Sequence, residues 1–531
     1  MLTDPASRPS WRGEYGGPWQ IELGLLALVL AAASFIAPLA DPDLPMHLAI
    51  GEWIVRHGTV PTVEPFAWTR AGEPYYAYSW LPEVGFFAAY RAAGVMGVQV
   101  LQGLGVLATL LSLAVLARLA RWSVWTAVVL AASYAVTAMS LAPYLRPHLV
   151  LIAAVPLAWG CALRLVESDR PWRWASGIFM LSALSANSHL LFPVIAAPWL
   201  LLALRWPGSG RAAWLVGATM AGWLLTPYAF DWPAVFALNF NDNVLFTYPT
   251  PIGELTPGVQ AAVNGRGVLL VMTVVFALLP WLATRLTTRE RIIWGAAWLA
   301  GFLAFALAVR AFLVWWLLLL PMVGGLVDGI ARLPRRREIL LAQRIAVGAL
   351  VLLLAFARAS IAGAPWAEDT GAARWIPRRA APWVDPVARW LDCRMRDEAS
   401  GRAMTAFPLG TYLTWHYPRL SYSIDSRNIF PDSVAAAEGY VLASERRLAL
   451  GPWRSADVAI VPFRYPVASA LDTADDWRRA VMVVDRGEWS DSDSLGLWIR
   501  EAWWLAASDS LLPDPPMRLR MGREGVEEAC H

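Results

Sequence analysis

Lysine is absent from this chain of 531 residues, so the 44 basic side chains are all arginines. Charged residues make up only 16% of the sequence and hydrophobic residues 57%, which excludes an ordinary soluble globular protein. The net charge is only +3 and the arginines lie in short loops between apolar runs, so the sequence does not indicate nucleic-acid binding. The scarcity of charge predicts a polytopic membrane protein.

Cysteine is also scarce, with three residues, which is too few for a disulfide framework. Cys161 lies inside an apolar run. Cys393 and Cys530 can pair only if the C-terminal region faces an oxidising compartment, and two reduced thiols are an equally open alternative. The sequence has no P-loop and no G-x-G-x-x-G after a strand, so it indicates no nucleotide cofactor.

Apolar runs long enough to cross a bilayer recur along most of the chain. They lie near 20–40, 94–118, 122–141, 148–166, 173–187, 189–204, 212–230, 266–284, 292–309, 311–331 and 342–360. The first run lacks a small-residue cleavage pattern, so we expect it to remain as a helix. The predicted fold class is mainly α, a polytopic membrane bundle of about eleven transmembrane helices.

Arginine clusters in alternate connections between these runs predict the orientation. The positive-inside rule assigns the clusters at 118–121, 164–173, 205–211, 285–291 and 332–344 to the cytoplasm. We therefore expect a cytoplasmic tail at 1–19 and a transmembrane domain at 20–360, with a first outer loop at 41–93. Residues 361–531 should form a periplasmic domain at the outer face of a bacterial inner membrane.

The two outward regions have distinct predicted structures. The first outer loop carries two amphipathic segments, 45–56 and 79–91, which indicate helices resting on the bilayer. Residues 361–531 contain strand-like and helical segments, which predict a small mixed α/β domain. The expected strands are 402–407, 420–424, 458–462 and 481–485, and the expected helices are 385–396 and 433–448.

The most informative polar feature is the acidic segment that follows the first apolar run. Asp41 and Asp43 flank Pro42, which favours an extended or turn geometry for the pair. One carboxylate can act as a general base, and oxygen ligands of this kind also bind divalent metals. His47 comes four residues after Asp43 and can be a metal ligand, an orienting partner or a phosphate contact. The alternative is that Asp41 or Asp43 only caps a helix.

Other polar residues interrupt apolar segments on the expected outer side. Arg146 and His148 flank a proline, where a guanidinium can clamp a phosphate or simply snorkel to the headgroups. Asn187 and His189 interrupt an apolar hairpin, where polar groups either face a cavity or bond to each other. Two further candidates are Glu254, a second carboxylate in the longest outer loop, and Arg310, a phosphate binder or a helix-boundary residue.

Residues 41–84 resemble the first outer loop of a bacterial group of C-superfamily membrane glycosyltransferases, within the protein O-mannosyltransferase and aminoarabinose transferase-like superfamily. The shared pattern is D-x-D, His, G-x-x-I, G-x-V-P and W-L-x-E. Further similar segments follow in order: YLRPH (144–148), SANSH (185–189), TPY (226–228), PIGELTP (251–257), GTYLTWHYP (410–418) and SIDSRNIF (423–430). The chain departs from the pattern at Pro45, Met46, Glu64, Leu190 and Ser426.

The resemblance implies a GT-C bundle with a small C-terminal α/β domain and an inverting glycosyltransferase activity. Sugar would pass from a polyprenyl-phosphate donor to a lipid, glycan or protein acceptor, with Asp43 as base and Asp41 as its support. A divalent metal, Mg²⁺ or Mn²⁺, would bind at Asp41, Asp43 and His47. The remaining candidates, His47, Arg146, His148, Asn187, His189, Glu254 and Arg310, would contact substrate or phosphate. A transporter or flippase of a lipid-linked substrate and a non-catalytic membrane scaffold remain alternatives.

Overall fold

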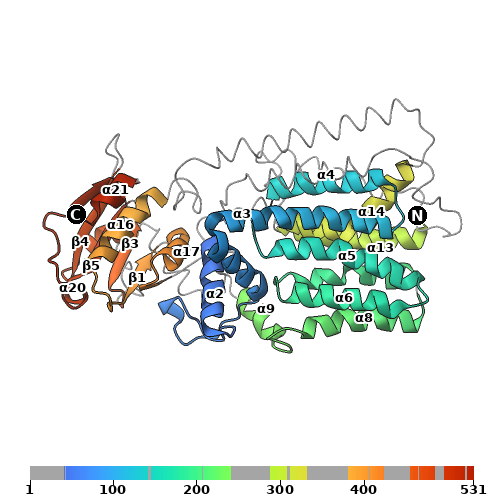
Figure 1. Ribbon diagram of the computed structural model, residues 1–531, viewed down its shortest axis with the longest axis horizontal. Helices are drawn as coiled ribbons and strands as arrows, with labels where there is room; N and C mark the ends of the chain where they lie inside the picture. The colour runs from blue at the N-terminus through green and yellow to red at the C-terminus, as the bar shows by residue number, and fades with distance from the viewer. Residues whose placement is uncertain are drawn as a thin grey trace, which may run out of the picture. The chain divides into compact units, whose positions relative to one another are not determined.

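A computed structural model describes residues 41, 43–141, 145–205, 207–240, 287–307, 311–331, 381–405, 407–423, 455–463, 466–484, 495–520 and 523–530. They divide into two compact units (Figure 1). The first unit holds the helices between Ala92 and Phe230 and those between 287 and 331. The second holds the first outer loop up to Arg91, the short segment beginning at Asp231, and the C-terminal region.

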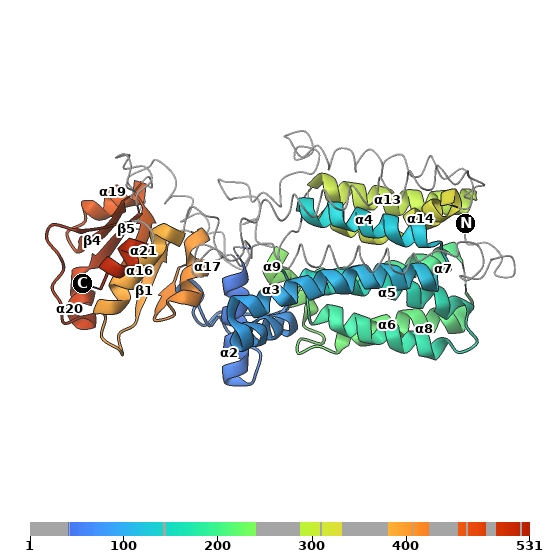
Figure 2. The same ribbon diagram turned by 45° about the horizontal axis from the view of Figure 1, so that its top comes forward.

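The first unit is helical, as the apolar runs predict. Its helices are the later part of α3 (Trp80–Leu119), α4 (Val124–Leu141), α5 (His148–Glu167), α6 (Pro171–Ala186), α7 (Leu200–Leu204), α8 (Ser209–Leu224), α13 (Thr288–Leu307) and α14 (Ala311–Ala331). Figures 1 and 2 show α5, α6 and α8 side by side, and α13 packs on α14. Helix α3 is broken at Ala93 and Gly94, where Gly94 adopts a left-handed φ of 57°, so its two parts belong to different units.

Two described helices, α3 and α5, are long and apolar enough to cross a bilayer. Two shorter apolar helical stretches, Phe192–Leu204 and Leu313–Asp328, accompany them. The predicted number of about eleven spans is not confirmed. The runs at 20–40, 266–284 and 342–360 lie outside the described residues.

The run at 189–204 is not one α-helix. It begins with the 3₁₀ segment η3 (Phe192–Trp199) and continues as the short helix α7. Pro193 and Pro198 explain the departure, because each lacks the N–H that an α-helix would use for its i→i−4 hydrogen bond.

The second unit contains a six-stranded mixed sheet in the order β2-β1-β3-β5-β4-β6. The strands are β1 (Gly401–Thr405), β2 (Leu420–Tyr422), β3 (Val458–Pro462), β4 (Trp477–Val484), β5 (Leu495–Arg500) and β6 (Met517–Arg520). Strands β1, β2 and β3 are parallel neighbours, β5 is antiparallel to β3 and β4, and β6 is parallel to β4. The helices of this region are α16 (Ala381–Arg394), α17 (Phe407–His416), α19 (Pro466–Asp472), α20 (Glu501–Ala507) and α21 (Arg523–Glu528).

The four predicted strands and the predicted helix at 385–396 are present with small shifts of their ends. Strands β5 and β6 were not predicted from the sequence. Strand β5 runs directly into α20 without a glycine or proline between them, so no turn signal marks where it ends. The helix predicted at 433–448 lies outside the described residues.

The first outer loop folds onto the edge of this sheet. It contains α2 (Leu44–His57), the 3₁₀ turn η2 (Trp68–Arg70) and the start of α3. Ala67 forms a parallel bridge with Tyr422 of the edge strand β2, and the Ser421 hydroxyl donates to the Phe66 carbonyl at 3.1 Å. The Trp68 indole N–H donates to the Ala403 carbonyl at 3.2 Å. A segment near the N-terminus therefore completes the C-terminal sheet.

A disulfide joins Cys393 at the end of α16 to Cys530 after α21. It decides between the two alternatives that the sequence left open for these cysteines.

Candidate functional site

The acidic segment lies at the start of α2, where Pro45 occupies the first helical turn. Asp41 is fully buried, and its Oδ1 accepts the main-chain N–H of Asp43 at 3.0 Å. Asp43 is the N-cap residue, yet its side chain makes no capping hydrogen bond. The capping alternative therefore does not describe Asp43. Asp43 itself is half-buried, and Asp41 fixes its main-chain N–H.

His47, one helical turn further, contacts the first turn of α3. Its Nδ1 lies 2.9 Å from Oε1 of Glu83, and the side chains of His47 and Glu83 are 19% and 4% exposed. The close approach of α2 to α3 depends on Gly51, because a Cβ there would meet the main-chain carbonyl of Glu83 and the Phe87 side chain. Gly51 lies four residues from His47 on the same face of α2. The close crossing of α2 and α3 at Gly51 therefore places the His47 imidazole next to Glu83.

The cluster carries a strong electrostatic bias. Burial by itself lowers the pKa of His47, but the hydrogen bond and charge of Glu83 and the charges of Asp43 and Asp41 outweigh it. The net result is a pKa raised above 6.5, which favours the imidazolium form. The charges of Glu83, Asp43 and Asp41 thus favour the protonated imidazole, in which both ring nitrogens are hydrogen-bond donors.

Glu83 is the site residue that sequence reasoning did not select. The available signal was the W-L-x-E segment at 80–83, which was part of the resemblance but received no role. Its second oxygen, Oε2, is buried and has no hydrogen-bond partner among the residues that the structure describes. A buried acceptor without a partner costs free energy. The hydrogen bond between Oε1 of Glu83 and Nδ1 of His47 offsets part of that cost.

The predicted metal set is not assembled in this region. Within the described ranges, no three His, Cys, Asp or Glu side chains form a group that could hold a metal ion. Nδ1 of His47 faces Glu83, and Oδ1 of Asp41 faces the Asp43 N–H. These atoms do not converge on one point, so we derive no step through a metal, and Mg²⁺ or Mn²⁺ binding stays a prediction.

The described candidates of the first unit lie at two neighbouring turns. The rings of His148 and His189 meet edge to face, with centroids 5.8 Å apart. Nδ1 of His189 accepts the Leu191 N–H at 3.0 Å. The structure thus brings these two histidines together, at the start of α5 and after the end of α6.

Asn187, at the end of α6, has a structural role in addition to any binding role. Its Nδ2 donates to the carbonyls of Ala183 and Leu225, each at 2.7 Å, which ties α6 to the end of α8. Arg146 is half-buried just before α5. Glu254 and Arg310 lie outside the described residues.

No known family model matches the sequence, and no curated protein matches it. Solved structures do match the fold. The archaeal oligosaccharyltransferase AglB from Archaeoglobus fulgidus, in complex with an inhibitory peptide and a dolichol-phosphate, aligns with a TM-score of 0.56 at 11% identity, over 86% of this chain and 70% of that one. ArnT from Cupriavidus metallidurans, bound to undecaprenyl phosphate, aligns with a TM-score of 0.55 at 13% identity, over 91% of this chain and 98% of that one.

The chain has the GT-C fold. This confirms the predicted architecture of a mainly helical, multi-pass membrane protein with a small sheet region. Identities of 11% and 13% establish the GT-C fold alone, so the activity has to be argued from the site.

Proposed function

We propose that this protein is a membrane glycosyltransferase that moves a sugar from a polyprenyl-phosphate donor to an acceptor on the outer face of the membrane. The observation that carries the proposal is the preorganised acidic cluster of Asp41, Asp43, His47 and Glu83 in the outer loop of a GT-C fold. Two structures that share this fold hold a dolichol-phosphate and undecaprenyl phosphate respectively, which supports the donor class.

Asp43 is the proposed general base. Its carboxylate accepts the proton of the acceptor hydroxyl or amide as that group attacks the anomeric carbon from the face opposite the phosphate. A new glycosidic bond forms, the bond between the anomeric carbon and the phosphate oxygen breaks, and polyprenyl phosphate leaves with one additional negative charge. Attack opposite the leaving group inverts the anomeric configuration. Asp41 holds the Asp43 main chain in position for this step.

The leaving phosphate requires positive charge. Arg146 and Arg310 are the proposed cations for it, because arginine can bind phosphate oxygens bidentately. His148 and His189 are proposed to contact the same donor. Asn187 is proposed to shape that region through its bonds to two helices, in place of direct substrate binding.

The proposed location is a bacterial inner membrane, with the second unit outside the cytoplasm. Two independent observations support this orientation. The Cys393–Cys530 disulfide lies in the C-terminal region, and the arginine clusters lie in the alternate set of connections.

The proposal is tested with purified full-length protein and a panel of undecaprenyl-phosphate hexoses and pentoses, together with lipid and glycan acceptors. We expect Asp43→Asn to lower the turnover rate by about 10²–10⁴-fold, as expected for loss of a general base. Asp397→Asn is the matched control, because Asp397 is an exposed aspartate of the same unit. Transfer by the Asp43→Asn variant at the wild-type rate would refute the base assignment. Lipid movement across vesicles without transfer from any donor would favour the flippase alternative. The absence of both transfer and lipid movement would favour the scaffold.

A further inference from the structure

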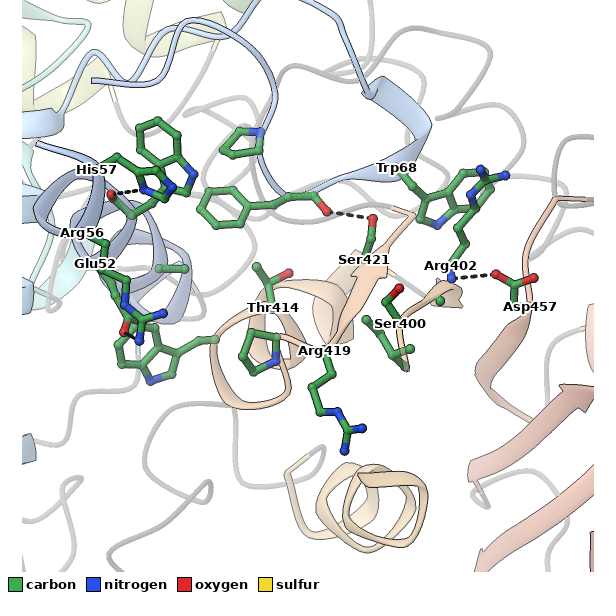
Figure 3. Close-up of a pocket in the computed structure, with 18 of the residues that line it drawn as sticks. Glu52, Arg56, His57, Trp68, Ser400, Arg402, Thr414, Arg419, Ser421 and Asp457 are labelled. Carbon is green, nitrogen blue, oxygen red and sulfur yellow. Dashed lines mark hydrogen bonds and ion pairs between the residues drawn. The ribbon is translucent and has the colours of Figure 1, made fainter. Parts of the chain in front are cut away.

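A cavity of about 750 Å³ lies within the second unit, which is in the size range of ligand pockets, about 300–1,000 Å³ (Figure 3). Its walls come from segments far apart in the sequence. The last turns of α2 and the loop at 65–68 form one side, and β1, β2 and the end of α17 form another. Asp457 and Trp503 complete the lining.

Tryptophan side chains form rigid walls of this cavity. Trp68 packs on the core cluster that contains Trp477 and Trp498, and its indole N–H is bonded to a main-chain carbonyl. Trp415 packs on the cluster around Met46 and Ile50. Each ring is half-buried, so part of it is anchored in the core while the rest faces the cavity.

The position of the Trp503 ring depends on Gly401, which has no side chain. A Cβ on Gly401 would lie 2.7 Å from Cζ2 of Trp503, so only glycine leaves room for the ring. The Trp503 indole N–H donates to the Ser400 carbonyl at 3.1 Å, which fixes its orientation. Anchored aromatic faces suit pyranose rings, because the negative face of the aromatic ring attracts the C–H groups of the sugar.

The charges around the cavity are mostly satisfied within the protein. Glu52 pairs with Arg56 at 2.5 Å, and the Arg419 guanidinium donates to Asp392 of α16, turned away from the cavity in Figure 3. Oδ2 of Asp457 accepts the main-chain N–H of Arg402 at 2.9 Å. Arg402 is exposed and has no ion pair among the described residues, so its guanidinium is available to a ligand.

The geometry argues against an extended peptide added to the sheet. Strand β2 ends the sheet, and its outer edge is already bridged by Ala67 and bonded to Phe66 through Ser421. A peptide that binds by strand addition needs unpaired edge groups, and here they are taken by the first outer loop.

We propose that this cavity binds the saccharide portion of an acidic glycan acceptor. Its sugar rings lie against Trp68, Trp415 and Trp503, and an acidic substituent binds the Arg402 guanidinium. This inference rests on the proposed function. Trp53 is ten residues from Asp43 along α2, so about 15 Å of helix separates the cavity wall from the base. The cavity is therefore a recognition subsite for one part of an extended acceptor. The attacking group belongs to another part of the same acceptor.

The test measures binding in the absence of any donor, by isothermal titration of the full chain in detergent micelles with hexagalacturonate or cellohexaose. We expect hexagalacturonate to bind about tenfold more tightly than cellohexaose, because only hexagalacturonate carries carboxylates that can form a charged hydrogen bond with the Arg402 guanidinium. Arg402→Ala should remove that difference. Gly401→Ala should weaken both ligands by displacing Trp503. Arg478→Ala is the matched control, because Arg478 is 64% exposed on β4 and does not line the cavity.

Equal binding of the two oligosaccharides, no binding of either at millimolar concentration, or unchanged hexagalacturonate binding in Arg402→Ala would each overturn the proposal. Asp43→Asn separates this proposal from the proposed function, since it should lower the transfer rate about 10²–10⁴-fold and leave oligosaccharide binding unchanged. If the protein binds hexagalacturonate as expected but transfers sugar from no donor, the saccharide-binding proposal stands and the proposed glycosyltransferase function is rejected. Transfer in a protein that binds neither oligosaccharide would reject the site alone.

Discussion

Replacing Glu83 with glutamine tests whether the buried pair with His47 holds the acidic site together. The substitution keeps the size of the side chain and leaves an oxygen that can accept the Nδ1 hydrogen, but it removes the charge. Glu83 is 4% exposed and His47 19%, so solvent screens the pair only slightly. A hydrogen bond to a charged group contributes about 1.5–3 kcal/mol to stability, which is the loss we expect for Glu83→Gln when His47 is protonated.

The loss should depend on pH in a defined direction. Because the folded-state pKa of His47 lies above 6.5, the stabilisation by Glu83 is fully present below pH 6.5. It disappears as the pH rises through the folded-state pKa, since the imidazole then becomes neutral in both states. Glu83→Gln should therefore differ most from the wild type near pH 5.5 and least near pH 9.

The assay is thermal unfolding of the detergent-solubilised protein, followed by tryptophan fluorescence between pH 5.5 and pH 9. Glu52→Gln is the control, because Glu52 pairs on the same helix with an Arg56 side chain that is 72% exposed. An exposed pair of this kind contributes only about 0.2–1 kcal/mol. A Glu83→Gln protein as stable as the wild type at pH 5.5, or a stability difference that increases with pH, would refute the reasoning.

Two further substitutions test the contacts that position the site. Gly51→Ala should destabilise the second unit by about 1–3 kcal/mol through a clash with the Glu83 carbonyl, whereas Gly85→Ala, where a Cβ meets open space, should be neutral in the same unfolding assay. Cys393→Ser should destabilise the protein by about 2–5 kcal/mol by removing the disulfide. Alkylation with mass spectrometry under non-reducing conditions should then detect one new free thiol, and Cys161→Ser should show no change in stability.

The parts of the fold that depend on local patterns could be predicted from the sequence. The apolar runs at 122–141 and 148–166 correspond closely to α4 and α5, because a membrane-spanning length of apolar residues is a local property. The amphipathic segment at 45–56 corresponds to α2 for the same reason. Prolines also act locally, but their effect at 189–204 was not anticipated, since composition alone does not distinguish a 3₁₀ segment from an α-helix.

The parts that depend on distant contacts could not be predicted in the same way. His47 and Glu83 are 36 residues apart, and their pairing follows from the crossing of two helices at Gly51. Trp68 reaches the carbonyl of a residue 335 positions later, and no periodicity in either segment marks that contact. Asp41, Asp43 and His47 could thus be proposed from the sequence, while the contact of His47 with Glu83 and the cavity required the tertiary structure.

The bridge between Ala67 and Tyr422 also constrains the order of folding. The loop that completes the sheet edge is synthesised early, whereas the strand it covers emerges only after the transmembrane helices. Until then the loop has no sheet to pair with, and an isolated C-terminal fragment would present an open edge that promotes association between chains. Assembly of the second unit is therefore a late, long-range event, and supplying the 41–91 segment as a separate polypeptide should rescue the solubility of such a fragment.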